Sequence, residues 1–170
     1  QEKAVTTPME FLNLFSNIKN LSFTHCVEAS DIELEKIKTL GATINHCVTS
    51  NRILNNSKLD LSKLKDIPFS IGTDGLSSNN SLSMFDELRN VLITHWEKNI
   101  IDFSKVLLKS ATVNPAISMG LNKGVIEKEF DSDMIALTLP DEIEDKDDLA
   151  MQIILHTKFV DKTIIGGEFV

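Results

Sequence analysis

The chain has 170 residues, of which 42% are hydrophobic, and its formal net charge at pH 7 is −8. This size and composition are typical of one globular domain with a substantial core. Only 17 residues are Lys or Arg. That balance argues against nucleic acid or an anionic membrane surface as a partner, because both are bound through basic side chains, and it favours a small-molecule substrate.

The longest apolar stretches fall far short of the roughly 18 residues that span a bilayer. Residues 1–3 have no signal-peptide pattern. We therefore expect a cytoplasmic protein without a membrane partner. Cys26 and Cys47 lack the C-x-x-C spacing of a redox or metal site, so we expect both to be reduced and to have no catalytic role.

The first part of the chain alternates between helix and strand patterns. In order, we expect a helix over 9–18, a strand over 21–27, a helix from the Ser30 cap to Gly41, a strand over 42–48, a short helix over 59–67 and a strand over 69–73. The Ser30 and Glu33 spacing is that of a capping box, and Pro68 ends the short helix. This alternation predicts a parallel sheet with right-handed crossovers.

Two longer helices are expected next, over 83–98 and over 103–119, the second interrupted near Pro115. The pattern changes at Gly124, which divides the chain into an α/β part over 1–123 and a small β-rich part over 124–170. The expected strands of the second part are the apolar runs 134–139, 153–155 and 163–170. The acidic stretch 141–148 predicts a solvated loop.

Each of the three expected strands ends near a His or an Asp. His25 and His46 lie near the ends of the first two strands, and Asp74 follows the third in a glycine-flanked turn. The intervals between them are each about one strand and one helix long, which predicts equivalent heights on neighbouring strands. Catalytic side chains converge at the carboxyl ends of the strands in parallel α/β barrels. The pattern therefore predicts part of a metal-dependent hydrolase site.

The segments around these residues closely resemble the amidohydrolase superfamily, in its branch of chlorohydrolases and nucleoside or guanine deaminases. The matching segments are 24–27, 45–54, 72–89, 111–116 and 124–137. The resemblance covers nearly all of this chain but only the second half of a family member. It implies an α/β fold, the C-terminal part of a TIM-like (β/α)8 barrel (about strands 6–8), with a small β-rich appendage.

The resemblance also implies roles for the matched residues. Asp74 would end the eighth strand, bind one Zn2+ or Fe2+ and exchange a proton with the attacking water. His25 would act beside it from the sixth strand, and His46 would face the substrate from the seventh. Ser78 and Asn79 would fix the turn after Asp74 and offer further contacts to substrate. We thus predict Asp74 and His25 as catalytic residues.

Glu28 is open to a second interpretation. The spacing of His25 and Glu28 is similar to the His-x-x-Glu of the family's fifth strand, where the Glu moves protons. Counting back one strand per unit from Asp74 makes His25 sixth, so we interpret Glu28 as a polar residue ahead of the Ser30 cap. If a further strand lies between them, Glu28 becomes the general acid and base.

The metal site implied by the resemblance is incomplete in this chain. The family's His-x-His pair is absent, and the remaining histidines are His95 and His156. A catalytic zinc normally has three protein ligands and a water, so Asp74 alone would not hold it. We expect the chain to be inactive by itself and to belong to a longer protein that binds one Zn2+ or Fe2+ per subunit.

The residues of these motifs are most similar to those of deaminases of adenine-type nucleosides, especially the aminofutalosine deaminases of menaquinone synthesis. We therefore predict a hydrolase acting on a C–N bond outside peptides. The alternatives are methylthioadenosine or adenosylhomocysteine deaminase, another chlorohydrolase or guanine deaminase, and a non-catalytic barrel scaffold. Because a truncated barrel leaves open sheet edges, we also expect a homo-oligomer or a companion N-terminal fragment.

Overall fold

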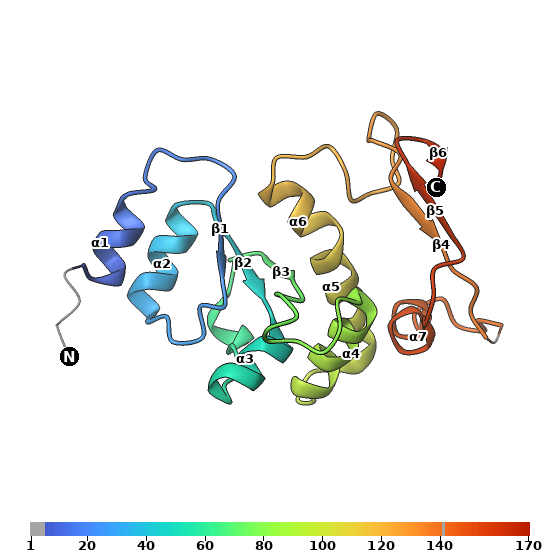
Figure 1. Ribbon diagram of the computed structural model, residues 1–170, viewed down its shortest axis with the longest axis horizontal. Coiled ribbons are helices and arrows are strands. Elements are labelled where there is room, and N and C mark those ends of the chain that lie inside the picture. Colours follow the sequence, from blue (N-terminus) through green and yellow to red (C-terminus); the bar gives the residue numbers. More distant parts are fainter. Residues whose placement is uncertain (1–5, 141) are drawn as a thin grey trace.

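The computed structural model describes residues 6–140 and 142–170, which form two sheets and their surrounding helices (Figure 1). One sheet contains β1 (Ser22–Thr24), β2 (Thr43–His46) and β3 (Phe69–Ile71), and the other contains β4 (Met134–Ala136), β5 (Lys162–Ile165) and β6 (Glu168–Phe169). The α-helices are α1 (Pro8–Asn13), α2 (Asp31–Thr39), α3 (Val48–Asn55), α4 (Met84–Thr94), α5 (Ile100–Ala111), α6 (Val113–Ser118) and α7 (Leu149–His156). Within the described ranges, no helix has the length and apolar character that crossing a membrane requires.

The first sheet is parallel, and its strands are neighbours in the order of the sequence. Phe23, Ile44 and Phe69 stand in register across it, and so do Thr24, Asn45 and Ser70. Successive side chains of a strand point to opposite faces. One face of the sheet is therefore apolar and the other polar, and the three carboxyl ends lie along one edge.

Helices cover the apolar face in two clusters of buried side chains. The first cluster is Leu12, Leu34, Ile37, Ala42, Ile44, Leu59, Leu64 and Ile67. The second is Val48, Ile71, Leu88, Val91, Leu92, Phe103, Leu107 and Ile154. Burying one such aliphatic side chain contributes about 1.5–3 kcal/mol relative to leaving it exposed. This face is thereby packed against α1 and α2 near β1 and against α4 and α5 near β3.

Local sequence signals account for the ends of the first helices. Thr7 caps α1 and Ser30 caps α2, each in a reciprocal capping box, with Glu10 and Glu33 as partners. Such a box satisfies two backbone donors that the helix cannot satisfy internally. The predicted Ser30–Glu33 box is confirmed.

Several predicted elements differ from the observed ones. The first helix ends at Asn13 instead of residue 18, and the predicted helix over 59–67 is a single 3-10 turn, Leu61–Lys63. The run 153–155 was predicted as a strand but lies inside α7, because a short apolar run does not distinguish the two states. Helix α3 was not predicted. Residues 1–3 and Asp141, the first residue of the predicted acidic loop, lie outside the described residues.

The last part of the chain is not purely β-structured. Strands β4, β5 and β6 form an antiparallel sheet, whereas α7 packs against α4 and α5. Ile154 of α7 is fully buried in the second cluster. Arg89 on α4 donates hydrogen bonds to the carbonyl oxygens of Ile154 (2.8 Å) and Thr157 (2.9 Å). The proposed division at residue 124 therefore separates two segments that share a core.

The turns at the carboxyl edge are attached to α4 through Glu87, whose side chain is 1% exposed. Its carboxylate accepts hydrogen bonds from the Thr49 amide (3.0 Å), the Thr49 hydroxyl (2.7 Å) and the Asn79 side-chain amide (3.1 Å). The Asn79 amide also donates to the Thr73 carbonyl at 2.7 Å. Glu87 therefore connects the first turn of α3 to the loop that follows β3.

His46 and His95 form a second buried polar contact, on the helix-covered face of the sheet. Their Nε2 atoms lie 3.0 Å apart, so one ring donates to the other, and the accepting ring must be neutral. The Phe103 ring packs edge-on against His95. Burial and the neighbouring His95 lower the pKa of His46 to about 3. Burial also lowers the pKa of His95.

Replacing Glu87 with Gln should lower the free energy of unfolding by about 2 kcal/mol. In either orientation, the Gln amino group would face a donor, the Thr49 N–H or the Asn79 amide, and leave it unsatisfied. Denaturant unfolding of the 170-residue chain measures this difference. Glu35→Gln, on an exposed position of α2, is the control. Equal stabilities of the two variants would contradict the assignment.

The histidine pair should make the fold less stable below neutral pH. Both imidazoles have lower pKa values when folded than the unfolded value of about 6.5, so the unfolded chain binds more protons. Stability is complete above about pH 6.5 and falls as pH drops, by up to about 1.4 kcal/mol per pH unit for each histidine. For His46 this fall continues toward about pH 3. Urea unfolding between about pH 7 and 5 measures the slope. His46→Gln should reduce the slope, and the exposed control His156→Gln should not; an unchanged slope in His46→Gln would refute the cause.

Candidate active site

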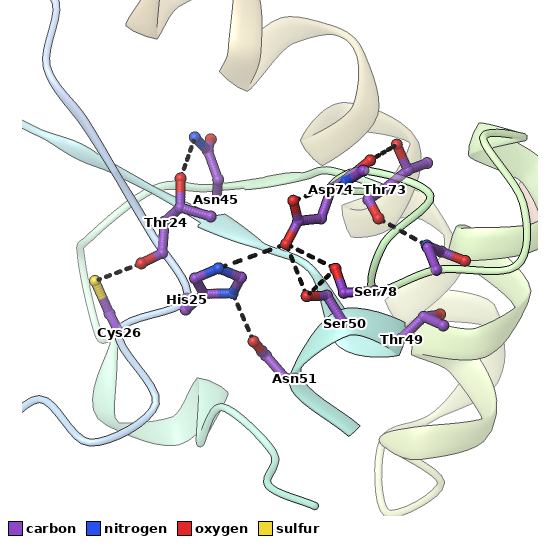
Figure 2. Close-up of polar contacts among 12 residues, drawn as sticks. Thr24, His25, Cys26, Asn45, Thr49, Ser50, Asn51, Thr73, Asp74 and Ser78 are labelled. Carbon is purple, nitrogen blue, oxygen red and sulfur yellow. Dashed lines mark hydrogen bonds and ion pairs between the residues drawn. The ribbon is translucent and has the colours of Figure 1, made fainter. Parts of the chain in front are cut away.

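Asp74 lies in the turn after β3, where its backbone has a positive φ of 59°. Its Oδ2 accepts hydrogen bonds from the hydroxyls of Ser50 (2.7 Å) and Ser78 (3.2 Å), and its Oδ1 accepts from the Gly75 amide (2.7 Å). The Ser50 hydrogen bond, followed by that of Gly75, holds the pKa of Asp74 below its usual value. The turn therefore presents an ionised carboxylate at the carboxyl edge of the sheet (Figure 2).

His25 follows β1 and faces Asp74 across the end of β2, the strand between β1 and β3 (Figure 2). Its Nε2 lies 3.7 Å from Asp74 Oδ2, and its Nδ1 lies 2.7 Å from Asn51 Oδ1. Regular alternation would place His25 on the same face as Phe23, against the helices. The positive φ of 70° at His25 ends that alternation at the strand terminus. The structure thus brings the two predicted catalytic residues together.

Sequence reasoning did not single out Ser50 and Asn51 as site residues. They are adjacent in the first turn of α3, and both side chains are buried. Ser50 contacts Asp74 and Asn51 contacts His25. Their position just after β2 was the available signal, because the residues that follow a parallel strand lie at the edge where the strand ends meet.

His46 lies away from this cluster, which corrects the prediction that it faces the substrate. It follows Ile44 by two positions in β2 and therefore shares the helix-covered face. Its side chain is fully buried against His95. The prediction considered the height of His46 along the strand but not the face to which its side chain points.

Ser78 and Asn79 fix the turn after Asp74, as predicted from the sequence. Ser78 donates to Asp74, and Asn79 connects Thr73 to Glu87. Both side chains are buried. Their contact with a substrate stays a prediction.

Glu28 lies four residues after β1 and is exposed. The strand order is β1-β2-β3, so no strand besides β2 lies between the strands that precede His25 and Asp74. The condition under which Glu28 would become the general acid and base is therefore not met. Glu28 instead lines the rim of a neighbouring cavity.

That cavity has a volume of about 420 Å3 and opens beside His25. Its wall is mainly apolar and includes Phe11, Leu12, Phe23, Val27 and Leu54, with His25, Glu28 and Asn51 among the polar groups. An apolar cavity with a few polar groups at one end is typical of small-molecule sites.

The described residues contain no group of three or more His, Cys, Asp or Glu side chains that could hold a metal ion. Asp74 is nevertheless a suitable single ligand, because carboxylate oxygens bind Zn2+. A carboxylate has about four acceptor positions, and the three hydrogen bonds to Asp74 leave one of them on Oδ1. Asp74 thus fits a metal site whose other ligands come from outside the described part of the chain.

Comparison with known proteins places this geometry in a family. An aminodeoxyfutalosine deaminase from a Nitratiruptor species is 40% identical over 168 residues, covering 99% of this chain and 41% of that relative. The crystal structure of Helicobacter pylori aminofutalosine deaminase in complex with methylthio-coformycin matches with a TM-score of 0.91 and 32% identity, over 99% of this chain and 43% of that one.

An adenosine deaminase from Xanthomonas campestris with bound zinc has the same fold, with a TM-score of 0.79 and 23% identity over 95% of this chain and 39% of that one. The chain spans about two fifths of the length of the relatives it matches. The predicted fold, part of a TIM-like α/β barrel, is confirmed by these structures. The Amidohydrolase family model matches residues 2–170, and the chain belongs to that family.

Proposed function

We propose that this chain forms the Asp74 side of the active site of a metal-dependent hydrolase that deaminates an adenine-type nucleoside such as aminofutalosine. The observation that carries the proposal is the ionised Asp74 carboxylate at the edge of the sheet, with the His25 imidazole 3.7 Å away. The two aminofutalosine deaminases described above, which align with nearly the whole chain, support the choice of substrate.

The reaction replaces an amino group by oxygen: water adds to the carbon that bears the amino group, and ammonia leaves. When bound, Zn2+ or Fe2+ would make water acidic enough to react near neutral pH. The carboxylate of Asp74 would hold the metal and accept the proton that water loses. His25 would hydrogen-bond the attacking water and orient it. The proton finally leaves with ammonia.

The remaining parts of the site must come from another segment or another chain. β1 and β3 are the outer strands of the parallel sheet among the described residues, and parallel sheets are normally covered and closed against further strands. We infer that strands from a companion segment or a second copy complete both the sheet and the metal site. The supporting observations are the open sheet edges and the single suitable metal ligand.

Deamination is tested with the product of the complete open reading frame that encodes this chain. Ammonia release is measured with aminodeoxyfutalosine, adenosine and 5′-methylthioadenosine, before and after treatment with a chelator. Asp74→Asn should lower kcat about 10²–10⁴-fold, since an amide does not take the proton. Asp66→Asn, at an exposed position paired with Lys38, is the matched control. Wild-type kcat in Asp74→Asn would exclude the proposed role.

The 170-residue chain itself should bind zinc only weakly. One carboxylate supplies a fraction of the ligands that a zinc site needs, so neither Zn2+ nor a chelator should shift the thermal midpoint of unfolding. Calorimetric titration and thermal unfolding measure this in parallel. Micromolar or tighter binding that is lost in Asp74→Asn would show that the chain holds the metal unaided, contrary to the proposal.

A further inference from the structure

The His25 ring has a different partner at each nitrogen. Nδ1 lies 2.7 Å from the side-chain oxygen of Asn51, and Nε2 lies 3.7 Å from Asp74 Oδ2 (Figure 2). The Asn51 side chain is only 4% exposed, whereas that of His25 is 40% exposed. The buried side-chain oxygen of Asn51 therefore contacts Nδ1 of His25, whereas part of the His25 ring is exposed to solvent.

The Asn51 contact decides which nitrogen carries the proton. An amide oxygen accepts hydrogen bonds and does not donate them, so Nδ1 must carry the hydrogen in this contact. In the neutral ring, Nε2 then has a free lone pair directed toward Asp74. We propose that Asn51 is a positioning residue that fixes the tautomer and the orientation of His25, so that Nε2 is the atom that accepts a hydrogen bond on the Asp74 side of the ring. The link between Asn51 and catalysis rests on the proposed function, whereas the tautomer of His25 follows from its contact with Asn51.

The backbone around Asn51 makes it suited to this role. The backbone N–H of Asn51 donates a hydrogen bond to the Cys47 carbonyl oxygen at 2.9 Å in the first turn of α3. The preceding residue, Ser50, donates to Asp74, and Thr49 is held by Glu87. Adjacent residues of one helical turn thus hold both members of the catalytic pair. The relative position of His25 and Asp74 is set by that turn.

Nitrogen NMR of the 170-residue chain tests the tautomer directly. Two-bond proton–nitrogen spectra distinguish a protonated from an unprotonated ring nitrogen, and His25→Gln identifies the His25 signals among the four histidines. At a pH where the ring is neutral, the wild-type chain should show hydrogen on Nδ1. Hydrogen on Nε2 would overturn the proposal.

Asn51→Leu removes the acceptor at nearly constant size. The ratio of the Nδ1–H to the Nε2–H form should fall about tenfold, as expected for the loss of one hydrogen bond to the ring. Asn55→Leu, at an exposed position one turn further along α3, is the control and should leave the ratio unchanged. An unchanged ratio in a folded Asn51→Leu chain would contradict the role.

Kinetics of the complete open-reading-frame product separate positioning from simple stabilisation. Asn51→Leu should lower kcat about 10–100-fold, with KM changing less than about threefold. Asn51→Asp keeps the acceptor and should restore most of kcat, while its added negative charge should move the acid limb of the pH–rate profile to higher pH. Loss of kcat in Asn51→Asp without that movement would refute positioning. An inactive wild type would refute the proposed function but leave the NMR result decisive for Asn51.

Discussion

The hydrogen bond from Ser50 to Asp74 is the contact on which the arrangement of the site depends. It joins the helix that follows β2 to the turn that follows β3, and it is the largest influence that keeps Asp74 ionised. The same helical turn holds His25 through Asn51 and is anchored to α4 through Glu87. A charged group at the end of one strand is thus stabilised by groups from its neighbours, which couples the chemistry of the site to the packing of the helices.

Much of the fold could be predicted because its signals are local. Capping residues, the proline before β3 and the alternation of apolar segments indicate where most strands and helices lie. The elements that were not predicted correctly have physical reasons. α3 begins directly after β2 without a side-chain cap, so no start signal separates the two. The run at 153–155 becomes helical because Ile154 packs against α4 and α5, which only tertiary structure reveals.

The positions of His25 and Asp74 in the candidate site were predictable, and those of the residues that support them were less so. His25 and Asp74 follow strands, and their left-handed backbone conformations turn them toward each other in a way that strand alternation alone would not suggest. His46 obeys alternation and is buried beside His95 instead. Sequence spacing therefore located the edge of the sheet at which these residues lie, but the face to which each side chain points depended on the backbone at a single residue. Membership of the amidohydrolase family is consistent with a site assembled at strand ends.

The contact of α7 with α4 and α5 affects how the molecule can be divided. Ile154 fills the second cluster, and the carbonyl groups of Ile154 and Thr157 are acceptors for Arg89. A truncation placed at the change of sequence character near residue 124 would remove those acceptors and open a hole beside Leu88 and Leu107. Arg89 lies two residues from Glu87 on α4, so the damage would reach the helix that anchors the first turn of α3. Helix α7 therefore supports, through α4, the turns at the carboxyl edge of the parallel sheet. Shortened versions of the chain should keep α7 intact.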